Sequence, residues 1–83
     1  MQINLTQRAN IALQKADGEL KERLENVFRI FESGGDLPAD QVRMSPSRPG
    51  VFVVRIDDQR LFFQRGLDAI QVLDIVPSSQ AAR

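Results

Sequence analysis

The sequence predicts an α+β domain with the element order β-α-α-β-β-β, in which a two-helix hairpin packs on one face of a small antiparallel sheet. Two patterns carry this prediction. Apolar residues recur at helical spacing before residue 33, whereas β-branched and aromatic residues dominate short segments after residue 50. The chain has 83 residues, so we expect one domain, 1–83, with no room for a second core.

The helical half is expected over residues 6–33. Before it, Gln2–Leu5 alternates polar and apolar residues, as a short strand does. Thr6 is expected to cap a helix that runs to about residue 16, where Asp17-Gly18 breaks it. A second helix is then expected from about Glu19 to Glu32.

The segment 34–50 is predicted to be a loop, because it holds three of the four prolines and three of the five glycines. Loops of this length are often functional. Within it, Asp40–Met44 could pair briefly with the sheet. At its start, a glycine of Ser33-Gly34-Gly35 is available for the left-handed position after the helix.

Residues 51–76 are predicted to form the C-terminal strands. A turn at Asp57-Asp58-Gln59 and a second at Gly66-Leu67-Asp68 divide this region, Pro77 stops it, and the tail Ser78–Arg83 is expected to fray. The three strands are Val51–Ile56, Arg60–Gln64 and Ala69–Val76. We expect a core that includes Leu13, Leu20, Leu24, Val27, Phe31, Phe52, Val54, Leu61, Phe63 and Val72.

Composition excludes several classes of protein. The chain has no cysteine and no histidine, which excludes a disulfide framework, a thiolate zinc site, a cysteine nucleophile and a His-based metalloenzyme. We expect no metal and no cofactor. The formal net charge is zero, so bulk charge alone would not hold the chain to nucleic acid or membrane. No apolar run could span a membrane and the N-terminus lacks an apolar signal core, so we predict a cytoplasmic protein.

Neutrality of the whole chain hides a cationic region. Residues 43–65 carry five arginines and two aspartates. The arginine side chain is a planar fork that fits phosphate or carboxylate, which a lysine ammonium does not.

The strand register predicts where two of these arginines lie. A short turn at Asp57-Asp58 would place Arg55 opposite Arg60 on the face away from the helices, with Val53 and Phe62 beside them. Such a face is an anion site with an apolar floor. The alternative is an ordinary solvated face, on which the arginines are neutralised by nearby aspartates: Asp57, Asp58 or Asp74.

The element order and the segment Gly50–Phe63, GVFVVRIDDQRLFF, resemble the RelE/ParE superfamily of bacterial type II toxins. The resemblance covers nearly the whole chain. Arg60 falls on the family's arginine that opens the third strand, and Arg55 on a basic position that ends the second.

This resemblance implies a toxin that is silenced by a cognate antitoxin. RelE-like members are messenger-RNA interferases that act on the ribosome, and ParE-like members inhibit DNA gyrase. For an interferase, the resemblance implies that Arg55 and Arg60 are catalytic residues that stabilise phosphate charge. The RNA- or partner-binding residues would then be Arg43, Arg48, Val53, Phe62 and Arg65.

The sequence also departs from the interferase pattern. After the last strand it has Pro77-Ser78-Ser79-Gln80 where an interferase carries an arginine, histidine or tyrosine, and it has no lysine beyond Lys21. Arginine is a poor general base. Two hypotheses therefore stay open: an interferase that lacks the usual C-terminal His or Tyr, and a ParE-like or non-catalytic member that acts only by protein binding.

Overall fold

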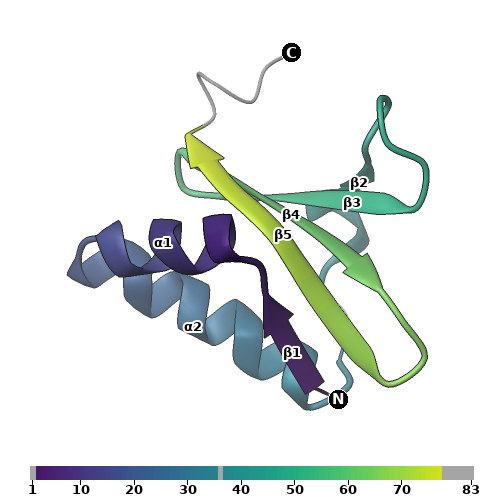
Figure 1. Ribbon diagram of the computed structural model, residues 1–83, viewed down its shortest axis with the longest axis horizontal. Helices are drawn as coiled ribbons and strands as arrows, with labels where there is room; N and C mark the ends of the chain where they lie inside the picture. The colour runs from purple at the N-terminus through teal and green to yellow at the C-terminus, as the bar shows by residue number, and fades with distance from the viewer. Residues whose placement is uncertain (1, 36, 78–83) are drawn as a thin grey trace.

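The computed structural model describes residues 2–35 and 37–77, in which two helices cover one face of a five-stranded sheet (Figure 1). This confirms the predicted α+β fold class. In chain order the elements are β1 (Gln2–Leu5), α1 (Gln7–Lys15), α2 (Gly18–Glu32), a 3-10 turn (Ala39–Gln41), β2 (Val42–Met44), β3 (Val51–Ile56), β4 (Gln59–Arg65) and β5 (Ala69–Pro77). Strand β2 lies inside the predicted loop and is part of the segment for which brief pairing was expected.

Side-chain caps decide where the helices begin. The Thr6 hydroxyl accepts a hydrogen bond from the Ala9 backbone N–H (3.2 Å), and the Asp17 carboxylate accepts one from the Leu20 N–H (3.0 Å). These bonds satisfy backbone donors that have no partner within the helix. Past the end of α2, Gly34 has a φ of +78°, the left-handed conformation that glycine adopts without steric cost.

The sheet is mixed, with the strand order β1-β5-β4-β3-β2. The strands from β2 to β5 pair antiparallel, whereas β1 pairs parallel to β5 at the edge. The parallel pair is possible because both helices and three strands separate β1 from β5 in the sequence, so no short turn forces these two strands to be antiparallel. The antiparallel sheet expected from the C-terminal strands is thus extended by one parallel strand.

The core lies between the helices and the inner face of the sheet. Of the ten expected core residues, six are buried and the other four are partly buried against them. Phe63 is at the centre, where its ring lies 4.9 Å from that of Phe31 and 5.8 Å from that of Phe52, measured between centroids. Further buried residues in this cluster are Ala9, Phe28, Ile56, Ile70 and Ile75.

An irregularity in β5 connects the sheet to α1. Phe62 pairs with Asp74 and Phe63 pairs with Val72, so Leu73 is an extra residue in β5. The Thr6 hydroxyl donates a hydrogen bond to the Leu73 carbonyl (2.6 Å). Because of the extra residue, Val72 and Ile75 are both buried although three positions separate them.

Two predictions concern the tail and the membrane. The expected fraying of Ser78–Arg83 lies outside the described residues. Among residues 2–35 and 37–77, neither helix has the length and apolar character needed to cross a bilayer.

Candidate functional site

The outer face of the sheet, away from the helices, carries the paired arginines. Arg55 lies opposite Arg60 and Val53 opposite Phe62 in the β3–β4 hairpin, as predicted. Strand β2 continues this face, because Arg43 pairs with Val53. Three arginines from three neighbouring strands therefore surround one valine.

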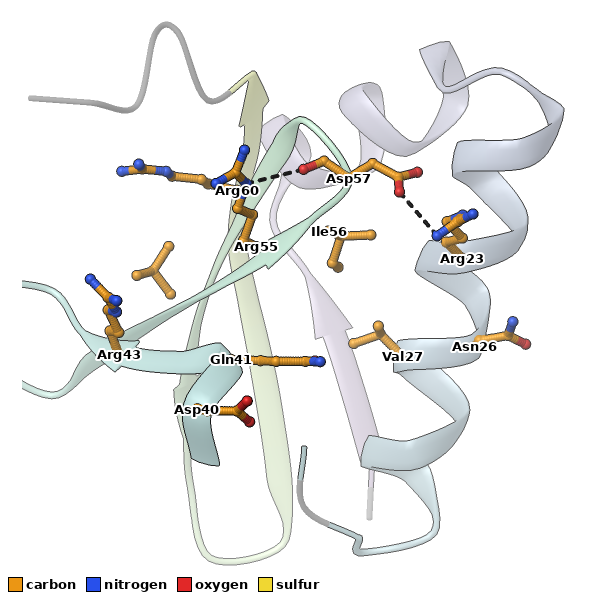
Figure 2. Close-up of a pocket in the computed structure, with 11 residues that line it drawn as sticks. Arg23, Asn26, Val27, Asp40, Gln41, Arg43, Arg55, Ile56, Asp57 and Arg60 are labelled. Carbon is orange, nitrogen blue, oxygen red and sulfur yellow. Dashed lines mark hydrogen bonds and ion pairs between the residues drawn. The ribbon is translucent and has the colours of Figure 1, made fainter. Parts of the chain in front are cut away.

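A groove of about 670 Å³ runs from this face to helix α2 (Figure 2). Its lining carries four arginines and two aspartates, a surplus of positive charge. We call it the arginine groove; it is lined by Arg23, Asn26, Val27, Asp40, Gln41, Arg43, Val53, Arg55, Ile56, Asp57 and Arg60.

The short length of β2 opens this groove. β2 pairs with β3 only along Phe52–Val54, and the chain before it forms a 3-10 turn. The end of β3 at Arg55 and Ile56 therefore extends beyond β2. The space beside it is bordered by α2, from which Val27 and Asn26 line the groove.

The turn of the hairpin is tied to α2 by an ion pair. Arg23 Nη1 lies 3.0 Å from Asp57 Oδ1, and the same guanidinium lies 3.2 Å from Glu19 Oε1 (Figure 2 shows the Arg23–Asp57 pair). Asp57 has a φ of +54°, a conformation that aspartate tolerates better than most residues. Its carbonyl accepts a hydrogen bond from Arg55 Nε (3.2 Å), which orients the Arg55 guanidinium.

The charges of the groove favour an anion. Like charges on directly opposite residues of a hairpin destabilise it, and Arg55 and Arg60 form such a pair. The half-buried Val53 gives the groove an apolar patch beside these arginines. A bound anion would remove the repulsion and gain from both forks.

The structure groups some of the predicted site residues and separates others. Arg43, Val53, Arg55 and Arg60 line the arginine groove together, and Phe62 lies beside Val53 on the same face, outside the lining. Two arginines lie elsewhere. Arg48 is in the loop between β2 and β3, where its carbonyl accepts from Val51 N–H, and Arg65 lines a second groove at the far end of β4.

Residues of α2 and of the segment before β2 are the part of the groove that sequence reasoning missed. Arg23 forms an i,i+4 ion pair with Glu19, a pattern typical of a solvated helix surface. Its second contact, with Asp57, joins residues far apart in the sequence and leaves no local signal. Gln41 and Asp40 reach the groove because of the 3-10 turn, which the predicted loop did not specify.

Two of the aspartates that the sequence offered as neutralising partners for Arg55 and Arg60 form ion pairs with other arginines. Asp57 pairs with Arg23, whereas Asp74 lies 3.5 Å from Arg8 Nε and accepts from the Ile75 N–H (2.9 Å). Asp40 is the groove carboxylate for which the described residues provide no ion pair. Among those same residues, no three His, Cys, Asp or Glu side chains gather as a metal site would require.

Solved structures resemble this architecture closely, although the sequence matches no protein-family model and no curated protein. RelE in the RelB–RelE antitoxin–toxin complex of Methanococcus jannaschii superposes with a TM-score of 0.80 at 9% identity, over 95% of this chain and 94% of that one. YafQ of Escherichia coli gives 0.77 at 13% identity over 95% and 94%, and the YoeB/ParE toxin of Agrobacterium tumefaciens gives 0.75 at 13% over 93% and 98%.

The chain has the fold of the RelE-like toxins. This confirms, at the level of the fold, the resemblance to the RelE/ParE superfamily that the sequence indicated. The RelE-like fold spans nearly all of this chain, so the arginine groove belongs to the shared domain and not to an added segment.

Proposed function

We propose that this chain is the toxin component of a type II toxin–antitoxin system and that it inhibits translation by cleaving messenger RNA on the ribosome. The observation that carries the proposal is the pairing of Arg55 with Arg60 at the arginine groove of a RelE-like fold. This function places the protein in the cytoplasm and needs no cofactor.

The groove offers the charge stabilisation that RNA cleavage requires. An RNA strand carries its own nucleophile, the 2′-hydroxyl, which attacks the neighbouring phosphorus while the bond to the 5′-oxygen breaks. The products are a 2′,3′-cyclic phosphate and a 5′-hydroxyl, whose oxygen takes its proton from water. Negative charge grows on the phosphate oxygens in that step, and Arg55 and Arg60 would stabilise it. Arg43 would hold the backbone, and we assign to Asp40 the role of accepting the proton of the 2′-hydroxyl.

A cognate antitoxin is the second part of the proposal. RelE of Methanococcus jannaschii was solved with RelB, and YoeB of Staphylococcus aureus was solved with YefM. An acidic segment laid over the arginine groove would neutralise Arg55 and Arg60 and exclude RNA. The local positive charge would also speed association with such a partner, in a salt-sensitive way.

Induced expression in a bacterial host tests the toxin role. We expect growth arrest for the natural sequence and for Lys21→Ala, which removes an exposed cation of α2 outside the groove. Arg60→Ala should relieve the arrest and lower cleavage by about 100-fold or more, the usual loss on removing one charge-stabilising donor. Primer extension on ribosome-bound message should map the cuts; unaffected growth with the natural sequence contradicts the proposal.

A second candidate is a protein that acts only by binding, either on DNA gyrase or as a non-catalytic relative. The ion pairs of Asp57 with Arg23 and of Asp74 with Arg8 favour it, because they leave few carboxylates able to take a proton. Asp40→Asn separates the two candidates: it should abolish RNA cleavage by an interferase and leave the arrest caused by a binding protein intact. DNA damage with a repair response, without RNA cuts, would identify a gyrase inhibitor.

A further inference from the structure

A second groove, of about 430 Å³, lies at the opposite end of the outer face, and three of its seven lining residues carry carboxamides. The register places Asn4 of β1 beside Gln71 of β5, and Gln71 beside Gln64 of β4. Three carboxamides therefore lie in one row across three neighbouring strands. We call this the amide groove; it is lined by Asn4, Gly50, Gln64, Arg65, Gly66, Ala69 and Gln71.

 

The row is chemically suited to reading a nucleobase. Neighbouring strands lie about 4.8 Å apart, so successive carboxamides are spaced closely enough to contact one planar ligand together. Each carboxamide offers two N–H donors and one carbonyl acceptor, the groups that pair with the edges of bases. Among residues 2–35 and 37–77, no side-chain hydrogen bond engages the carboxamides of Asn4, Gln64 or Gln71.

Strand β4 links the two grooves. Its outward positions are Arg60, Phe62 and Gln64, each about 7 Å from the next because side chains on one face of a strand are two residues apart. Arg60 lines the arginine groove and Gln64 lines the amide groove, with the half-buried Phe62 between them. A cation, an aromatic ring and a carboxamide thus follow one another along a single line, as single-stranded RNA would require for phosphate, base face and base edge.

We propose that the amide groove binds the edge of a nucleobase in the RNA strand whose phosphate occupies the arginine groove, and that it gives the protein a base preference. This inference rests on the proposed function, because it assigns a second subsite to the same RNA. Asn4, Gln64 and Gln71 are the residues that discriminate between bases, whereas Arg55 and Arg60 bind any sequence.

Binding of short single-stranded RNAs tests the inference without requiring cleavage. The probes are four oligonucleotides of equal length that differ in the base at one position, and the readout is the ratio of the tightest to the weakest Kd by fluorescence anisotropy. The variants are Gln71→Ala and Asn4→Ala, both at exposed positions, and Gln64→Met, which keeps the volume of a half-buried side chain. Gln14→Ala, an exposed glutamine of α1, is the matched control.

We expect the natural sequence and Gln14→Ala to discriminate by about fivefold or more, the lower range for a good base contact. The three amide variants should reduce that ratio towards one and leave the Kd of the weakest RNA unchanged. A preference that survives in all three variants, or RNA binding with no preference in the natural sequence, overturns the inference and leaves the proposed function in place. If none of the four RNAs binds the natural sequence, the proposed RNA function is contradicted as well.

Discussion

The two faces of strand β4 differ in what determines their residues. On the inner face, Leu61 and Phe63 are buried against the helices, and their burial explains why they are apolar. On the outer face, Arg60 lies opposite Arg55, an arrangement that weakens the hairpin. Folding accounts for the inner residues and opposes the outer pair, and this contrast is the reason for proposing that the outer pair binds an anion.

The largest expected effect falls on the inner face. Phe63→Ala removes a ring that packs against Phe31 and Phe52, and should lower the free energy of unfolding by about 3–5 kcal/mol. A domain of 83 residues has a total of about 4–12 kcal/mol, so this variant should be largely unfolded or close to it. Urea denaturation measures the loss. Phe62→Ala, on the outer face of the same strand, should cost clearly less, and an equal cost would contradict the assignment of the two faces.

A smaller loss is expected where α1 is fixed to the sheet. Thr6→Ala removes both the cap of α1 and the hydrogen bond to the Leu73 carbonyl, and should cost about 1–2 kcal/mol. Thr6→Ser keeps the hydroxyl and should retain most of the stability in the same urea experiment. If Thr6→Ser is as unstable as Thr6→Ala, packing of the Thr6 methyl group contributes more to stability than the hydrogen bonds of its hydroxyl.

The outer face should respond in the opposite direction. Arg55→Glu replaces the repulsion with Arg60 by an attraction, so the free energy of unfolding should rise by about 0.2–1 kcal/mol. The same change should abolish growth arrest, because it places a carboxylate where a phosphate is proposed to bind. A variant that is both less stable and inactive would indicate that the arginine pair serves the fold.

The smallest effect concerns the ion pair across the arginine groove. Arg23 is about half exposed, so loss of its contact with Asp57 in Arg23→Ala should change the free energy of unfolding by at most about 1 kcal/mol. Thermal unfolding in low and high salt measures it: the difference between Arg23→Ala and the natural sequence should shrink as salt screens the pair. A difference that persists in high salt would mean that packing of the Arg23 stem is responsible.

Local patterns were enough to predict most of the fold and the centre of the site. Alternation along β3 and β4 predicted the hairpin register, and with it the pairing of Arg55 with Arg60 and the position of Val53 and Phe62 beside them, which the structure contains. Side chains alternate strictly along a strand, so one turn position determines every pair. Thr6 was likewise recognised as a cap from its place before a helical pattern.

Contacts between distant segments could not be predicted in this way. The parallel pairing of β1 with β5 and the Arg23–Asp57 ion pair depend on how the helices pack on the sheet, which no local pattern records. The extra residue at Leu73 is similar, because β5 has an uninterrupted strand-like sequence. The amide row was missed for the same reason, since Asn4 joins Gln71 only through the parallel strand pair.

The salt dependence of RNA binding tests most directly whether the arginine groove holds phosphate. The Kd for a short single-stranded RNA should be measured at several salt concentrations for the natural sequence, for the double variant Arg55→Gln with Arg60→Gln, and for Lys21→Ala. Each phosphate neutralised in a single strand contributes about 0.7 to the slope of log K against log salt, so the double variant should bind more weakly with a slope shallower by about 1.4. Lys21→Ala should match the natural sequence. An unchanged affinity and slope in the double variant would contradict the central claim, because Arg55 and Arg60 would then be ordinary solvated side chains.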